Sequence, residues 1–223
     1  MAFLYNIGIQ AYHLAIQLAA PFNEKAALLR KGRKEVWKKA AGIQRGEGRL
    51  VWFHAASLGE FEQGRPVIEA LKAAEPATQI LLTFFSPSGY EIRKNYTGAD
   101  YILYLPGDTQ RNAVRLIEKF RPDAAVFIKY EFWFHYLNEL NKRNIPVYLI
   151  SAIFRPNQPF FKSWGKLHRR MLGCFKELFV QDGQSVELLK SIGIKNVRLT
   201  GDTRPGKTDR GKCKTNRQNR AIL

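Results

Sequence analysis

The chain has 223 residues, 45% of them hydrophobic, which is enough for one large or two small domains with a buried core. Its 36 Lys and Arg residues outnumber its 19 Asp and Glu residues, so that the formal net charge is +17. This composition excludes a wholly disordered chain. The charge predicts an anionic partner, which could be a nucleic acid, a phospholipid surface or a phosphorylated substrate.

Residues 1–23 predict a helix with one narrow polar stripe and one broad apolar face, and they carry no acidic, Lys or Arg side chain. The polar stripe consists of Asn6, Gln10, His13 and Gln17. The apolar face consists of Phe3, Leu4, Ile7, Ala11, Leu14, Ala15 and Leu18. A basic block follows, made of Lys25, Arg30, Lys31, Arg33, Lys34, Lys38 and Lys39.

The order of these two segments bears on the role of the N-terminus. A secretory signal would carry its charge before the apolar segment and a cleavage site after it. A spanning helix needs roughly 20 predominantly apolar residues, and the polar stripe interrupts such a run. We therefore favour a helix that lies in a membrane interface, with the basic block on anionic headgroups. A core helix of a globular domain and a full membrane span are the alternatives.

From residue 49 onward, strand-like and helix-like segments alternate. Apolar runs predict strands at residues 49–55, 79–85, 101–106, 124–129, 146–151, 177–181 and 196–201. Helical patterns lie between them at residues 62–76, 86–96, 109–120, 131–144 and 185–193. The strands are continuously apolar, which indicates that both faces of the sheet are covered. The pattern predicts an α/β fold with a Rossmann-like, doubly wound parallel sheet.

Individual residues predict where these helices begin. Pro66 is expected near the first turn of its helix, where a missing N–H has no cost. Ser86 is expected to cap the next helix, with Pro87 in its first turn, and Asp108 to cap the helix at 109–120.

Several functional classes lack their motifs. The pattern GxGxxG does not occur, so the common dinucleotide cradle is excluded. The four histidines share no metal-ligand spacing, and Cys174 and Cys213 suggest neither a disulfide framework nor a metal site. We therefore predict no metal. His54 is expected to make a hydrogen bond in the core or in a turn.

Two acidic residues follow predicted strands, each expected at the start of the next helix. These are Glu60, after the small-residue turn at 55–59, and Glu131, after the strand at 124–129. A carboxylate in a first turn stabilises a helix by roughly 0.3–1 kcal/mol, so a capping role is one interpretation of Glu60. The other is a general base that takes a proton from a hydroxyl. Because both acids follow strands of one sheet, we expect them to share a cleft.

Basic and aromatic residues interleave after the strand at 146–151. The basic ones are Arg155, Lys162, Lys166, Arg169 and Arg170, and the aromatic ones are Phe154, Phe160, Phe161 and Trp164. The segment could be a solvated helix face, an anion site with an apolar floor that suits a phosphorylated lipid, or a site for single-stranded nucleic acid. We favour the lipid because the N-terminal helix points independently to a membrane.

Six motifs occur in the order HAASLGE, FFSPSGYE, YLPGDT, KYEFW, IPVYLISA and TGDTR. Together they resemble the 3-deoxy-D-manno-octulosonic acid (Kdo) transferases of Gram-negative bacteria, over roughly residues 1–204. The resemblance implies the N-terminal half of a GT-B-type glycosyltransferase of lipopolysaccharide biosynthesis. Such an enzyme moves Kdo from CMP-Kdo to the lipid A precursor (lipid IVA) without a metal or other cofactor, at the cytoplasmic face of the bacterial inner membrane.

The resemblance also implies roles for single residues. Glu60 would be the proton acceptor, and Glu131 and Arg204 would stabilise the transition state. The expected acceptor-binding residues are Ser57, Gly59, Arg155 and Lys162. Two positions depart from the family pattern, since many relatives have an acid at the position of Lys129 and a proline at that of Phe134.

Three regions are expected: a membrane-associating helix and basic segment at 1–45, an acceptor-binding domain at 46–204 and a disordered basic tail at 205–223. Relatives continue after the Arg204 position with a second domain, whereas this chain has Pro205-Gly206 and a short tail. We therefore expect a missing donor domain, through a frameshift or truncation, and no transfer by the isolated chain. The alternatives are a lipid-binding module without catalysis and a nucleic-acid-binding protein, although no nucleic acid partner is expected.

Overall fold

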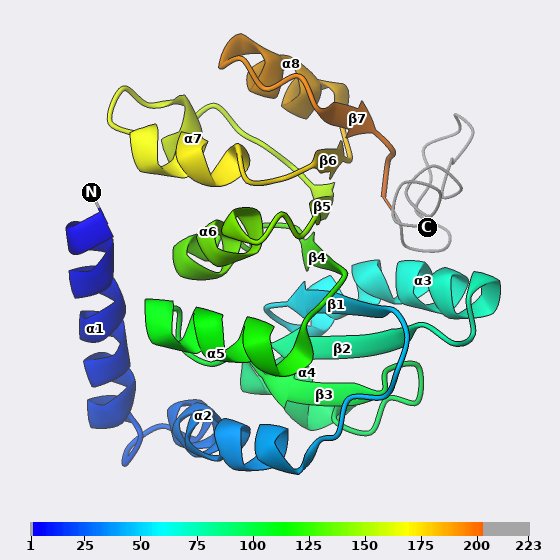
Figure 1. Cartoon of the computed structure of the whole chain (residues 1–223). Coiled ribbons are helices and arrows are strands. Elements are labelled where there is room, and N and C mark those ends of the chain that lie inside the picture. The colour runs from blue at the N-terminus through cyan, green and yellow to red at the C-terminus, as the bar shows by residue number, and fades with distance from the viewer. Residues whose placement is uncertain (1, 203–223) are drawn as a thin grey trace.

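The computed structural model describes residues 2–202, which form a single parallel sheet with helices on both of its faces (Figure 1). The strand order of this described sheet is β3-β2-β1-β4-β5-β6-β7. The strands are β1 Leu50–Ala55, β2 Gln79–Phe84, β3 Tyr101–Tyr104, β4 Ala124–Ile128, β5 Val147–Ala152, β6 Glu177–Val180 and β7 Val197–Leu199. Each lies where the apolar runs predict a strand, and all neighbouring pairs are parallel. The predicted α/β fold is confirmed.

The helices cover both faces, as the continuously apolar strands predict. They are α1 Ala2–Ala19, α2 Glu24–Gly42, α3 Leu58–Ala74, α4 Pro87–Arg93, α5 Gln110–Phe120, α6 Phe134–Lys142, the short 3₁₀ helix η1 Pro159–Phe161, α7 Lys166–Leu172 and α8 Gly183–Ser191. Figure 1 shows α5 and α6 on one face and α3 on the other. Alternate residues of β1 serve the two cores: Trp52 packs with α5 and α6, and Phe53 packs with α3.

The sheet has a topological switch point between β1 and β4. From β1 the chain moves outward through β2 to β3, and it then returns to place β4 on the other side of β1. The loops that follow β1 and β4 therefore leave in opposite directions. Open α/β sheets hold their ligands in the crevice that this divergence creates at the carboxyl ends of the strands.

Helix α3 begins earlier than predicted. Its first residue is Leu58, so Pro66 lies inside the helix and the prediction that it belongs to the first turn is wrong. The cause is Glu60, whose carboxylate accepts the N–H of Ser57 and so stabilises a helix start at this point. Pro66 is then an interior residue that cannot donate to the preceding turn.

Asp108 caps a different helix from the one predicted. Thr109 caps α5, because its hydroxyl accepts the N–H of Asn112 at 3.2 Å. The Asp108 carboxylate accepts the N–H groups of His135 and Tyr136, each at 3.1 Å, at the start of α6. The sequence pattern places Asp108 beside α5, whereas the tertiary fold presents it to α6. Ser86 and Pro87 stand before and at the start of α4, as predicted.

Helix α1 contacts the domain through polar groups and through Tyr5 and Ile16, and it turns most of its other large apolar side chains outward. Tyr5 donates a hydrogen bond to Asp108, and Asn6 Oδ1 lies 2.6 Å from His135 Nε2. The exposed large apolar side chains of this helix are Phe3, Leu4, Ile7, Leu14 and Leu18. Helix α2 carries the basic block and buries Val36 and Ala40 in the core. None of the helices described here is long and apolar enough to cross a membrane.

Candidate functional site

Glu60 lies in the first turn of α3, directly after β1, where the switch point opens. Its Oε2 atom accepts the N–H groups of Ala56 at 2.6 Å and Ser57 at 3.1 Å. The Oε1 atom makes no hydrogen bond to any described residue. One oxygen is therefore held by the backbone, while the other can accept a proton from a ligand.

The surroundings of Glu60 make it a better base than an ordinary carboxylate. Burial raises the pKa of the Glu60 carboxyl, and the negative charge of Glu131 raises it further. The amide of Ala56, the charge of His54 and the amide of Ser57 oppose this rise. A general base becomes more effective as its pKa approaches the working pH. Because Glu60 and Glu131 follow the neighbouring parallel strands β1 and β4, the structure brings the two acids to the same edge of the sheet.

Glu131 lies in the loop between β4 and α6. The prediction that it opens a helix is wrong, because α6 starts three residues later, at Phe134. Lys129 adopts a left-handed backbone conformation with φ of 65° and turns the chain immediately after β4. Glu131 is 6% exposed, and its Oε2 atom lies 3.0 Å from His54 Nε2.

His54 is fully buried on β1 and links β2 to Glu131. Its Nδ1 atom lies 3.0 Å from the carbonyl oxygen of Thr83 and 2.9 Å from its hydroxyl. The prediction of a hydrogen-bonded core histidine is confirmed. The indole N–H of Trp133 approaches the same place, 2.6 Å from Glu131 Oε2 and 3.1 Å from His54 Nε2. The contact between His54 and Glu131 does not follow from the sequence pattern, which does not show that β1 and β4 are neighbours.

A line of stacked aromatic rings connects this site to α1. Trp133 stacks on Phe85 with ring centroids 4.7 Å apart, and Phe85 stacks on Tyr12 at 5.8 Å. We call Tyr12, Phe85 and Trp133 the aromatic ladder. The guanidinium of Arg33 lies over the ladder, 4.7 Å from the centre of the Phe85 ring. The ladder forms an apolar wall that runs from the N-terminal helix to the acids.

Three of the expected acceptor-binding residues lie at the same edge of the sheet as Glu60. Ser57 precedes α3, and Gly59 is exposed with nothing within 4 Å of the place that a Cβ atom would take, so packing does not require a glycine there. Arg155 forms an ion pair with Asp182 at 2.8 Å. Burial raises the pKa of the Tyr130 hydroxyl, Arg155 lowers it, and Asp182 and Glu60 raise it. Arg155 follows β5 and Asp182 follows β6, so this ion pair lies at the same edge of the sheet as Glu60.

The remaining expected residues are not joined to the acids. Lys162 is exposed, and its described contacts are made by its backbone, to Pro159, to Gly165 and to the guanidinium of Arg169. Arg204 lies outside the described residues, as does the region 205–223 that was expected to be a disordered tail. Within residues 2–202, no three His, Cys, Asp or Glu side chains come together as metal ligands.

Comparison with known sequences identifies similar proteins. Residues 24–206 match the family model described as 3-Deoxy-D-manno-octulosonic-acid transferase (kdotransferase). The 3-deoxy-D-manno-octulosonic acid transferase of Chlamydia trachomatis serovar D is 27% identical over 175 residues, which cover 74% of this chain and 41% of that protein. The transferase of Aquifex aeolicus is 29% identical over 154 residues, covering 68% of this chain and 39% of that protein. The chain thus spans less than half the length of these relatives.

Solved structures share the fold at lower sequence identity. The UDP-GlcNAc 2-epimerase of Neisseria meningitidis matches with a TM-score of 0.51 and 20% identity, over 70% of this chain and 47% of that chain. Another UDP-N-acetylglucosamine 2-epimerase matches with a TM-score of 0.54 and 18% identity, over 74% of this chain and 53% of that chain. These matches confirm the doubly wound sheet as one half of a GT-B-like architecture.

Proposed function

Because the chain belongs to the family of 3-deoxy-D-manno-octulosonic-acid (Kdo) transferases, we propose that it is the acceptor-binding part of an enzyme that moves Kdo from CMP-Kdo to the lipid A precursor. The observation that carries the proposal is the placement of Glu60 at the switch point beside Glu131, with Glu60 Oε1 unbonded within the described residues. The proposal concerns the part of the enzyme that this chain spans, which is less than half of its relatives.

In the proposed reaction, a hydroxyl of the acceptor sugar attacks the anomeric carbon of Kdo. The bond from that carbon to CMP breaks, CMP leaves with the bonding electrons, and the hydroxyl proton passes to the Glu60 carboxylate. Positive charge grows on the Kdo ring as CMP departs, and Glu131 is the proposed carboxylate that stabilises it. Arg204, beyond the described residues, is proposed to bind the departing phosphate.

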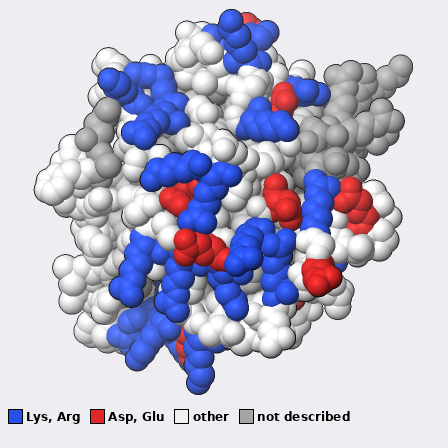
Figure 2. Space-filling model, viewed as in Figure 1, with Lys and Arg blue, Asp and Glu red and all other residues white. Residues whose placement is uncertain are grey.

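The proposed acceptor is a lipid, and α1 supports a position at the membrane surface. Leu4 and Leu18 are 71% and 66% exposed, on the side of the helix that faces away from the domain. Figure 2 shows Lys and Arg side chains gathered over the region where α2 lies in Figure 1. We propose that the apolar side of α1 enters the cytoplasmic face of the bacterial inner membrane while α2 contacts anionic headgroups.

The proposed function can be tested with a joined protein. In this joined chain, residues 1–202 are followed by the C-terminal part of the Aquifex aeolicus relative, which supplies what the present chain does not span. We expect it to transfer labelled Kdo from CMP-Kdo to the lipid A precursor. The unmodified relative is the control for the assay, and a thermal melt establishes that the joined chain is folded. A folded joined chain that binds both substrates without transfer would contradict the proposal.

A second function is a membrane-bound module that binds anionic lipid without catalysis. The exposed apolar side of α1 favours this second function, because membrane binding needs only an apolar surface and no catalytic group. The joined chain distinguishes the two functions, because a binding module gives retention of the lipid A precursor with no turnover, whereas the transferase gives both.

A further inference from the structure

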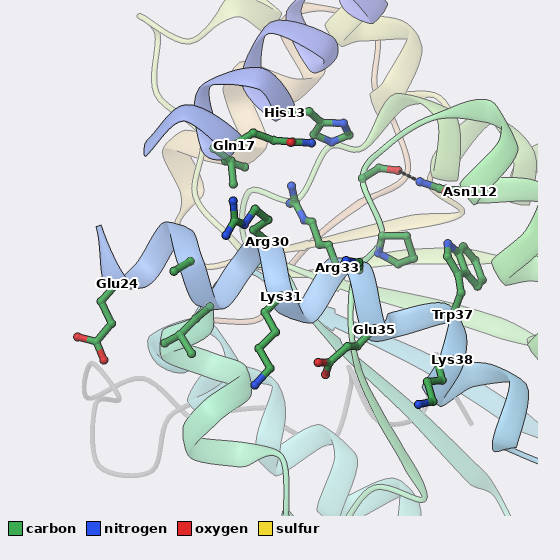
Figure 3. Close-up of a pocket in the computed structure, with 16 residues that line it drawn as sticks. His13, Gln17, Glu24, Arg30, Lys31, Arg33, Glu35, Trp37, Lys38 and Asn112 are labelled. Atoms are coloured by element: carbon green, nitrogen blue, oxygen red, sulfur yellow. Dashed lines mark hydrogen bonds between the residues drawn. The ribbon is translucent and has the colours of Figure 1, made fainter. Parts of the chain in front are cut away.

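A second candidate site lies between α1 and α2. A cavity of about 1220 Å³ opens there, bordered also by the loop that precedes α5, and neither Glu60 nor Glu131 lines it (Figure 3). Figure 3 shows Arg33 directed from α2 toward His13 of α1, and Arg30 directed toward another part of α1. The basic lining residues are Arg30, Lys31, Arg33, Lys34 and Lys38, against the acids Glu24 and Glu35. The cavity is therefore positively charged.

Arg33 is a partly desolvated cation in the wall of this cavity. Its Nε and Nη1 atoms are buried and have no hydrogen-bond partner among the described residues. Its guanidinium lies over the rings of Phe85 and Tyr12, at 4.7 Å and 5.5 Å. Burial lowers the pKa of Arg33, and only the hydroxyls of Tyr12 and Tyr136 act to raise it. A cation in such surroundings is stabilised by an anion, and no described carboxylate supplies one.

Arg33 differs in this respect from comparable residues. Four other half-buried arginines pair with a carboxylate within the described chain, namely Arg45 with Asp123, Arg49 with Glu75, Arg65 with Glu62 and Arg93 with Glu62. A fifth, Arg169, donates to the backbone carbonyls of Phe160, Lys162 and Ser163. The fold therefore supplies acceptors to all five arginines internally. At Arg33 the space beside the guanidinium is open for a ligand instead.

His13 faces Arg33 across the cavity and is held in place. A Cβ built on Gly107 would meet the His13 ring at 2.2 Å, which shows that the ring packs directly on this glycine. Burial lowers the pKa of His13, and the positive charge of Arg33 lowers it further. An anion placed between them would offset the effect of Arg33, so His13 is a natural reporter of anion binding.

We propose that this cavity binds a phosphate group, with Arg33 and Arg30 as the principal cations and His13 on the opposite wall. The planar guanidinium of arginine matches two phosphate oxygens at once, and its charge needs the compensation that a phosphate brings. The phosphate could belong to a lipid headgroup or be free in solution. The aromatic ladder connects this cavity to Glu131. Arg33 lies over Phe85 of the ladder, and Trp133 at its far end donates a hydrogen bond to Glu131. Phosphate binding here goes beyond the proposed function, since it requires no sugar transfer.

The binding test uses the full 223-residue chain at about 150 mM salt, which screens contacts between exposed charges. Inorganic phosphate is titrated by calorimetry. Vesicles of phosphatidylcholine with phosphatidic acid are compared with vesicles in which a carboxylate lipid supplies the same charge. Binding of inorganic phosphate identifies free phosphate as a ligand, and binding confined to the phosphatidic acid vesicles identifies a lipid headgroup.

The variant R33Q removes the central cation, and K25Q is the matched control because Lys25 is an exposed residue of the same helix that does not line the cavity. We expect R33Q to weaken phosphate binding by about tenfold, as the loss of a charge-assisted hydrogen bond does, and K25Q by less than about twofold. The proposal is overturned if binding of neither inorganic phosphate nor phosphatidic acid depends on Arg33, or if K25Q weakens it equally.

A measurement on the unmodified protein covers the case in which R33Q disturbs the docking of α1. The His13 ring signals are followed by NMR through a pH titration, with and without the phosphate ligand that the calorimetric or vesicle test identifies. We expect the ligand to raise the pKa of His13, because it offsets the charge of Arg33. An unchanged His13 titration at saturating ligand contradicts binding in this cavity.

Discussion

The Nε2 atom of His54 lies 3.0 Å from the Oε2 atom of Glu131, across the neighbouring strands β1 and β4. This contact joins the two sides of the switch point. Because His54 is also bonded to Thr83 of β2, the position of Glu131 is held by the middle of the sheet as well as by its own loop. The buried carboxylate of Glu131 is thus held in place by the fold, which is what the stabilising role proposed for it requires.

Replacement of His54 with alanine should destabilise the fold. H54A removes a hydrogen-bond partner from the buried Glu131 and from Thr83, which we expect to cost about 2–4 kcal/mol of unfolding free energy. Urea denaturation measures the loss. The control is H168A, since His168 is half-buried and bonds no carboxylate in the described chain, and its expected cost is less than about 1.5 kcal/mol. A variant H54A as stable as wild type contradicts the role of this contact.

The polar contact that docks α1 predicts an order of stability for two variants. Y5F removes the hydroxyl that donates to Asp108, at a cost of about 1 kcal/mol. D108A removes that bond and also the two that cap α6, which raises the cost to about 2–3 kcal/mol. Thermal or urea denaturation distinguishes them. Equal costs would show that the cap of α6 contributes little.

The sheet could be predicted from the sequence because its signal is local. The run from Leu50 to Ala55 is largely apolar and is fully buried in the structure, and the other strands follow the same rule. The helix starts were predicted less well, because tertiary contacts decide them. Asp108 caps α6 across the fold instead of its neighbour α5.

In the site, too, some features could be predicted from the sequence and others could not. Glu60 and Glu131 could be located because each follows a recognisable strand. The contact of Glu131 with His54 depends on the strand order, and no sequence pattern states that β1 and β4 lie side by side. Arg33 belongs to the basic block, but its isolation from carboxylates is a property of the packed structure alone.

The raised pKa of Glu60 predicts how stability depends on pH. A carboxyl whose folded-state pKa lies above its unfolded value stabilises the fold fully at low pH, and this contribution is lost as the pH rises through the folded pKa. The variant E60Q lacks this titration. The unfolding free energy of E60Q should therefore rise relative to that of wild type as the pH increases above about 4, the ordinary pKa of a glutamate. E69Q, on the exposed part of α3, is the control for loss of one charge. If the unfolding free energy of E60Q falls relative to that of wild type as the pH rises, the raised pKa of Glu60 is contradicted.

The outward side of α1 predicts membrane binding. The double variant L14S/L18S removes two exposed leucines, so we expect binding to anionic vesicles to fall by about tenfold or more while the unfolding free energy is almost unchanged. Vesicle flotation measures the first quantity and urea denaturation the second. I92S is the matched control, because Ile92 is similarly exposed but lies on α4. Vesicle binding that is equally strong in the double variant and in I92S contradicts the proposed orientation.

The central claim is that Glu60 accepts the proton of the acceptor hydroxyl, and the most direct test is the turnover of E60Q in the joined chain. Loss of a general base lowers kcat by about 10²–10⁴-fold, and we expect this loss with little change in KM. E69Q, which makes the same chemical change on the exposed side of the same helix, should keep kcat within about twofold. If E60Q is folded and retains the turnover of E69Q, Glu60 is not the proton acceptor.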